Sequence, residues 1–158
     1  MFRELARKNQ QLPEAECLEI LKHEKRGVLS VLGARGYPYG MPMNHFYCEE
    51  DGKIYFHCGK SGHRTDALGK ENKVSFCVYD SGYQPDGDWA LNIRSVIVFG
   101  KIVTIEDEQK IVDITTQLCY KFTDDEAYIK NEIENYAKNT ALLQLTPEHI
   151  CGKAVKES

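Results

Sequence analysis

The sequence predicts an α+β protein built around an antiparallel barrel or sheet of six strands, with helices at its periphery. Three observations favour this fold class: short β-branched apolar runs recur between glycine turns, Asp51-Gly52 forms a strong hairpin signal, and helical periodicity is found near the start, the middle and the end. The chain has 158 residues. This is close to one typical domain length of about 150, so we expect a single domain over 1–158.

The first elements are a helix and a strand. Pro13 opens a stretch of helical spacing that predicts a helix over 13–25, and Gly27 supplies a stop. The apolar run 27–32 predicts a strand, closed by a turn at 33–36.

The next two strands are joined by the hairpin signal. The segment 37–49 is strand-like, and Asp51-Gly52 connects it to a strand at 53–58. Gly40 and Pro42 both weaken a central ladder, so this segment is either the surface on which a flat ligand lies or an edge protected against pairing.

A crossover follows. The stretch 63–68 predicts a short helix and 73–79 a strand. The candidate strand 90–105 exceeds the usual length of about 5–6 residues, which suggests a bent barrel strand kinked at Gly100.

The last part carries two helices and a closing strand. Thr104 and Thr123 each stand three residues before a carboxylate, the pattern of a capping box, and apolar stripes follow both. A strand at 140–145 ends at Thr146-Pro147, and 150–153 adds a short piece.

Charge and composition exclude several classes. Lys and Arg number 20 against 24 Asp and Glu, giving a net charge of -4, so we expect no nucleic-acid partner. The sequence contains no stretch of 18 apolar residues and no apolar core of a signal peptide. We therefore expect a cytoplasmic protein that does not associate with a membrane. The six cysteines are expected to remain thiols.

The densest polar cluster is the segment 57–64. Gly62 allows close backbone approach at a helix start and Arg64 can pair with anionic oxygens, which indicates a phosphate site to which Lys60 and His63 add charge. The alternative, of about equal weight, is a basic solvated loop that caps a helix. Motifs of dinucleotide folds, P-loop enzymes, zincins and α/β-hydrolases are absent.

A metal site is disfavoured by spacing. His45 and Cys48 point to opposite faces of a strand, as do the adjacent His57 and Cys58, so these groups and His63 do not converge on a tetrahedral ion.

The order of the motifs resembles a known family. The segments Gly27-Val28-Leu29-Ser30, 36–44, 51–58 with Gly62-His63-Arg64-Thr65-Asp66, 73–76 and 94–100 are similar to the pyridoxamine 5′-phosphate oxidase-related FMN-binding split barrels, with the 5-nitroimidazole-resistance (Nim-type) branch the nearest. The segment 140–153 is similar to the final strand of that branch.

The resemblance implies a six-stranded split barrel that forms a homodimer with two FMN molecules at the subunit interface. It also implies cofactor contacts along the ring, around the phosphate and from a neighbouring strand; these residues are Met41, Pro42, Met43 and Asn44, then His57, Cys58, Gly62, His63 and Arg64, then Arg94, Ser95 and Val96. It assigns no catalytic acid or base and no metal.

The implied function is that of an oxidoreductase. FMN would carry electrons from a reduced nicotinamide to a small acceptor such as a nitroimidazole or a quinone. Two alternatives stay open: a haem-binding relative that uses His57 or His63 as axial ligand, and a non-catalytic flavin binder.

Overall fold

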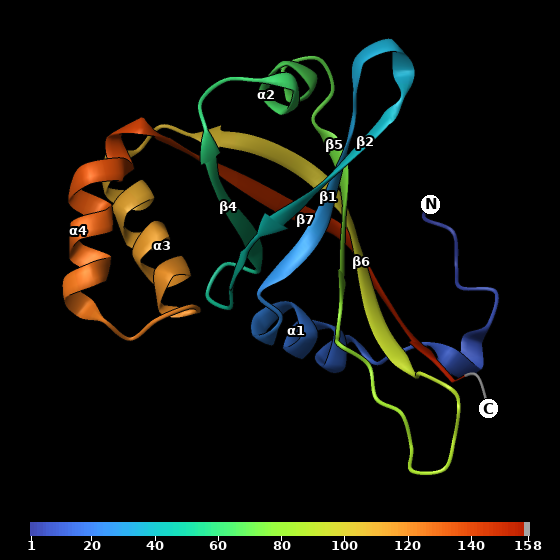
Figure 1. Cartoon of the computed structure of the whole chain (residues 1–158). Helices are drawn as coiled ribbons and strands as arrows, with labels where there is room; N and C mark the ends of the chain where they lie inside the picture. The colour runs from blue at the N-terminus through green and yellow to red at the C-terminus, as the bar shows by residue number, and fades with distance from the viewer. Residues whose placement is uncertain (157–158) are drawn as a thin grey trace.

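The computed structural model describes residues 1–156, and over these residues seven strands form one antiparallel sheet (Figure 1). The strands are β1 (Arg26–Leu32), β2 (Pro38–Asn44), β3 (Phe46–Cys48), β4 (Lys53–Gly59), β5 (Lys73–Tyr79), β6 (Ile93–Ile105) and β7 (Thr140–Val155). The α-helices are α1 (Glu14–His23), α2 (His63–Leu68), α3 (Glu108–Tyr120) and α4 (Glu126–Tyr136). None of the described helices is long and apolar enough to cross a membrane.

The strand order forces the sheet to curl into a barrel. The order is β2-β1-β5-β6-β7-β4-β3, so β2 and β3 lie at opposite edges. These two strands are nevertheless consecutive in the chain and are separated by His45 alone. The two edges must therefore meet at His45, although no ladder joins β2 to β4 beyond it. The result is a split barrel.

His45 is also the reason why the sheet has seven strands and not the predicted six. The sequence predicted one strand over 37–49, but His45 is fully buried at the junction and its Nε2 lies 2.7 Å from the carbonyl oxygen of Leu21. That carbonyl belongs to the last turn of α1, where the helix offers no partner. Lys121 donates to the carbonyls of Glu24 and His45, at 2.6 and 3.0 Å.

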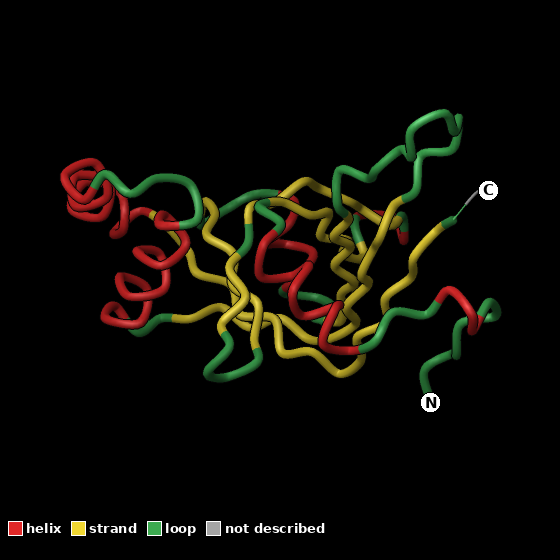
Figure 2. Tube along the Cα trace, turned by 90° about the horizontal axis from the view of Figure 1, so that it is seen from below, coloured by secondary structure: helices red, strands yellow, loops and turns green. Residues whose placement is uncertain are grey.

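The core fills the inside of the curled sheet. Figure 2 shows α1 lying across one opening of the strands, with α3 and α4 packed together to one side. Leu29, Phe56, Phe76 and Val98 point inward from four strands, and Leu21 of α1 joins them; all five are fully buried. This alternation of buried and exposed residues is the period of a half-buried strand.

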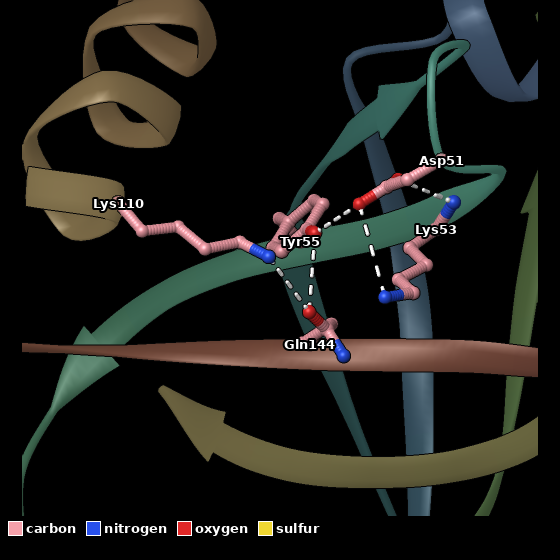
Figure 3. A network of polar contacts seen from close by, with 5 residues as sticks. All are labelled: Asp51, Lys53, Tyr55, Lys110 and Gln144. Carbon is pink, nitrogen blue, oxygen red and sulfur yellow. Dashed lines mark hydrogen bonds and ion pairs between the residues drawn. The ribbon is translucent and has the colours of Figure 1, made fainter. Parts of the chain in front are cut away.

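A polar network fastens α3 to the outer side of β4 and β7 (Figure 3). The hydroxyl of the fully buried Tyr55 donates to Asp51 at 2.5 Å, and its oxygen lies 3.2 Å from Gln144 Oε1. Lys110 of α3 donates to the same Gln144 oxygen at 3.1 Å and stands over the Tyr55 ring. Burial and the Asp51 carboxylate raise the pKa of Tyr55 well above its usual value. Tyr55 therefore stays protonated and structural.

The long strands β6 and β7 are bent together at a bulge. The register shifts between Phe99 and Gly100, as the sequence predicted for Gly100, because Phe99 pairs with His149 while Gly100 pairs with Pro147. A Cβ at Gly100 would overlap the Thr146 carbonyl oxygen, so only glycine fits there. The sequence predicted a separate short piece at 150–153. In the structure the segment after Pro147 instead continues β7 to Val155.

The helix starts differ from the predicted capping boxes. Asp107 caps α3 by accepting from Lys110 N–H at 2.7 Å, and Asp125 caps α4 by accepting from Tyr128 N–H at 3.0 Å. Thr104 belongs to β6 and caps no helix. The aspartates directly before each helix take the N-cap position in place of the threonines, because a carboxylate there accepts a stronger, charge-assisted hydrogen bond than a hydroxyl does.

Candidate functional site

The most distinctive polar arrangement lies at the split between β2 and β4. The outer half of β4, from Phe56 onward, pairs only with β7, and β2 pairs only with β1. Arg64, at the start of α2, stands across this opening: its Nη1 lies 3.4 Å from Met43 Sδ of β2, and it forms a hydrogen bond with Cys58 of β4.

Arg64 is a half-buried cation without a carboxylate partner. No described carboxylate forms an ion pair with it, and its buried Nε has no hydrogen-bond acceptor. An unmatched guanidinium nitrogen in a half-buried place is costly, and an anion at this place would satisfy it. Desolvation raises the pKa of Cys58, and Arg64 partly opposes this, so the thiol contributes a weak polar contact and not a second charge.

His63 joins α2 to the hairpin of β1 and β2. Its Nε2 accepts from Ala34 N–H at 3.0 Å, and its ring stacks on Tyr39 with centroids 4.4 Å apart. Gly33 makes this approach possible, because a Cβ there would lie 3.1 Å from His63 Nε2 and 2.9 Å from Tyr39 Cβ. His63 thus positions the start of α2, a role that the sequence did not indicate.

Gly62 precedes α2 with φ of 123°, a conformation that L side chains rarely adopt. It lets the chain turn from the 59–61 loop into the helix. Since α2 has only six residues, its dipole adds little, and anion binding by this loop would rest on Arg64.

The four predicted ring-contact residues of β2 divide between its two faces. Met41 and Met43 are buried in the core, so their side chains line the inside of the barrel. Pro42 is exposed on the outer face, and Asn44 accepts from Arg26 Nε at 2.8 Å. A ligand outside the barrel would meet Pro42, Asn44 and the β2 backbone.

Pro42 belongs to an apolar row across the outer face of the sheet. The register aligns Pro42, Val28, Cys77, Ile97 and Cys151 on five neighbouring strands. Ile97, within this set, is 36% exposed. We call this set the outer row.

The structure places the other predicted contacts away from Arg64. Arg94, Ser95 and Val96 lie at the far end of β6, next to Tyr79 and not next to the start of β5 that follows α2. Val96 is fully buried. Arg94 is engaged by Asp80, with Nε 2.8 Å from Oδ2, a pairing that the sequence analysis missed.

His57 also points elsewhere. Phe56 and Cys58 face the barrel interior, so His57 faces the side on which α3 and α4 pack. Desolvation lowers its pKa, and Glu132 of α4 opposes the shift. Of the predicted phosphate contacts, the structure therefore gathers Cys58, Gly62, His63 and Arg64 and separates His57 from them. Within residues 1–156, no group of three or more His, Cys, Asp or Glu is arranged to hold a metal ion.

Comparison with known proteins identifies the family of this split barrel. A family profile described as pyridoxamine 5′-phosphate oxidase matches residues 13–154. The chain belongs to this family. Among curated proteins, none matches.

Solved structures share the oxidase-family fold at low identity. A candidate 5-nitroimidazole antibiotic resistance protein from Bacteroides thetaiotaomicron is 18% identical with a TM-score of 0.75, over 91% of this chain and 86% of that one. An FAD-binding protein from Mesorhizobium loti is 17% identical with a TM-score of 0.66, over 93% and 98%. The flavocytochrome Anf3 from Azotobacter vinelandii is 16% identical with a TM-score of 0.76, over 98% and 73%.

Proposed function

We propose that this protein binds a flavin, with FMN as the cofactor, and that the phosphate is held at the split by Arg64. The supporting observation is the half-buried guanidinium with an unpartnered Nε between β2 and β4. Membership of the oxidase family and the flavin proteins among its structural neighbours point the same way.

The chain's own residues suit this role. Arg64 would pair with phosphate oxygens, and Gly62 would allow the backbone to approach them. Pro42 and Asn44 would line the ring on the outer face of β2. A bound flavin supplies the redox chemistry, so the protein needs only to hold it, orient it and exclude water.

A homodimer is part of this proposal. The outer row offers an apolar surface that a second copy of the chain would cover. Arg94 and Ser95, which lie far from Arg64 in one chain, would then reach the cofactor held by the other chain. Ile97→Lys would place a charge in this surface and should give a monomer by sedimentation, whereas Tyr128→Lys on exposed α4 should not. A dimer that survives Ile97→Lys would contradict the assignment of this surface.

The proposed activity is electron transfer from a reduced nicotinamide to a small acceptor such as a nitroimidazole or quinone. Cofactor-loaded protein should oxidise the nicotinamide with such acceptors faster than free FMN does. Equal oxidation rates for the loaded protein and for free FMN would contradict the proposed activity and favour a non-catalytic flavin binder.

Haem is the less favoured cofactor because the two candidate axial ligands do not face one common site. His63 Nε2 is occupied by Ala34 N–H, and His57 faces α4. A Soret band with bound iron in the purified protein would reverse this preference.

The decisive experiment compares FMN with riboflavin, which lacks the phosphate. Arg64→Ala should weaken FMN binding roughly 10- to 150-fold, the equivalent of a charge-assisted bond of about 1.5–3 kcal/mol. The affinity of Arg64→Ala for riboflavin should be unchanged. As a control, Lys70→Ala removes an exposed cation just after α2 and should change the affinity for neither FMN nor riboflavin. An unchanged Kd for FMN would move the phosphate away from the split.

A further inference from the structure

A second concave site lies beside the split. It is a cavity of about 1150 Å³ bounded by α2 and the loop after it, the ends of β4, β6 and β7, and the helices α3 and α4. Of the residues that the sequence associates with the phosphate site, Cys58 and Lys60 also line it. This volume is slightly above the usual range of small-molecule sites, about 300–1,000 Å³, so there is room for a drug-sized molecule.

The walls are aliphatic. Val103 and Ile105 of β6, Ile111 and Val112 of α3, Ile133 of α4 and Leu143 of β7 line the cavity. Val103 is 46% exposed although it is a large apolar side chain on a strand. The chain contains 9 Tyr, 6 Phe and 1 Trp, yet no aromatic side chain is among the lining residues. Such walls suit an alkyl chain or a saturated ring and offer no surface on which a flat aromatic ring stacks.

The mouth is acidic. Glu106, Glu108 and Glu134 line the cavity and are exposed, and among the side chains that the structure describes Lys60 is the only lining cation. Among the described residues, neither Glu106 nor Glu108 forms an ion pair, while Glu134 lies 3.8 Å from the exposed Lys130. A low-dielectric cleft with carboxylates of one sign at its mouth attracts cations and repels anions.

From the aliphatic walls and the acidic mouth we propose that this cavity binds a small aliphatic or alicyclic cation, of the class of alkylammonium compounds. The apolar part would lie between β6 and α3, and the charged head would face Glu106 and Glu108. This site adjoins the flavin site at Cys58 and does not require a bound flavin.

The test uses three probes of equal chain length: decylammonium, decanol and decanoate, each below its micellar concentration. Isoleucine methyl groups report the position, since Ile102, Ile105, Ile111 and Ile133 line the cavity and Ile20 and Ile54 do not. Decylammonium should bind most tightly and decanoate most weakly, and the shifts should be confined to the lining methyls. Saturating FMN should leave these affinities unchanged.

Two variants separate charge from shape. Glu106→Gln should weaken decylammonium about two- to fivefold and leave decanol unchanged, as expected for an exposed charge pair, whereas the exposed Glu50→Gln should affect neither probe. Ala141→Leu, with Val112→Phe as a second filling variant, should abolish binding of all probes.

Equal affinity for the three probes, tighter binding of decanoate, shifts at Ile20 or Ile54, or competition with FMN would each overturn the proposal. Tighter binding of benzylammonium than of a saturated ammonium of similar size would overturn the aliphatic assignment.

Discussion

Acidification should destabilise this protein through His45, which closes the barrel between β2 and β3. Burial, with Lys121 nearby, lowers the pKa of His45 from 6.5 to about 3. The unfolded chain therefore takes up a proton at His45 as the pH falls through 6.5, while the folded chain does so only near pH 3. Stability contributed by the neutral imidazole is complete above pH 6.5 and is lost between about 6.5 and 3.

The size of this effect follows from the two pKa values. At pH 5 His45 is protonated in the unfolded state and neutral in the folded state. The pH then lies about 1.5 units below the unfolded pKa of 6.5, so protonation stabilises the unfolded state by about 2 kcal/mol, at about 1.36 kcal/mol per unit. A native stability of about 5–15 kcal/mol makes this readily measurable.

Urea unfolding of the chain and of His45→Phe, at pH 7.5 and 5.0 and one protein concentration, isolates the effect. The variant should lose about 1–3 kcal/mol at pH 7.5, because the Leu21 carbonyl loses its donor. It should also lose about 2 kcal/mol less than the parent between pH 7.5 and 5.0. His23→Gln, which removes an exposed histidine, should keep the parent's pH dependence. An identical pH dependence in His45→Phe would refute this account of His45.

Three further outcomes concern stability and are measured by urea unfolding. Tyr55→Phe should cost about 1.5–3 kcal/mol, since the buried hydroxyl donates to a carboxylate, and a change near zero would show that the network of Figure 3 adds no stability. Gly100→Ala should destabilise strongly, while Gly59→Ala, with open space around its Cβ, should change stability by less than about 1 kcal/mol; equal costs would contradict the close contact at the bulge. Asp107→Ala should cost about 1 kcal/mol and Thr104→Ala less, and the reverse order would restore the threonine as the cap of α3.

Most of the successful fold predictions came from residues whose local backbone geometry is restricted. Asp51-Gly52 predicted its hairpin because Gly52 adopts φ of 68°, which a short turn requires. Gly100 predicted a bend for the same kind of reason, a backbone position that only glycine fits. The errors occurred where two segments compete for one role: Thr104 satisfied the capping pattern, yet Asp107 lies closer to the helix start.

The site was predictable only in part. Gly62 and Arg64 are two residues apart in sequence, so the segment they share could be recognised from the sequence alone. That Arg64 would also meet Met43 and Cys58 depends on the meeting of β2 with β4, which no local pattern encodes. The division of Met41 and Pro42 between inside and outside follows from strand alternation, which was available from the sequence but was not applied to the cofactor contacts. The aliphatic cavity joins α2 to α3 and α4 and carries no local signal.

The place of β7 in the sheet also has a consequence for biosynthesis. Without β7, the described strands fall into two unconnected groups, β2-β1-β5-β6 and β4-β3, because β7 alone hydrogen-bonds to both. During translation, residues 1–139 therefore emerge with the outward edges of β4 and β6 unpaired. Such edges are templates for pairing with other chains, so the nascent protein is exposed to aggregation until the last strand leaves the ribosome. Closure of the barrel then waits for β7 to leave the ribosome and is governed by the slow search that long-range strand pairing imposes.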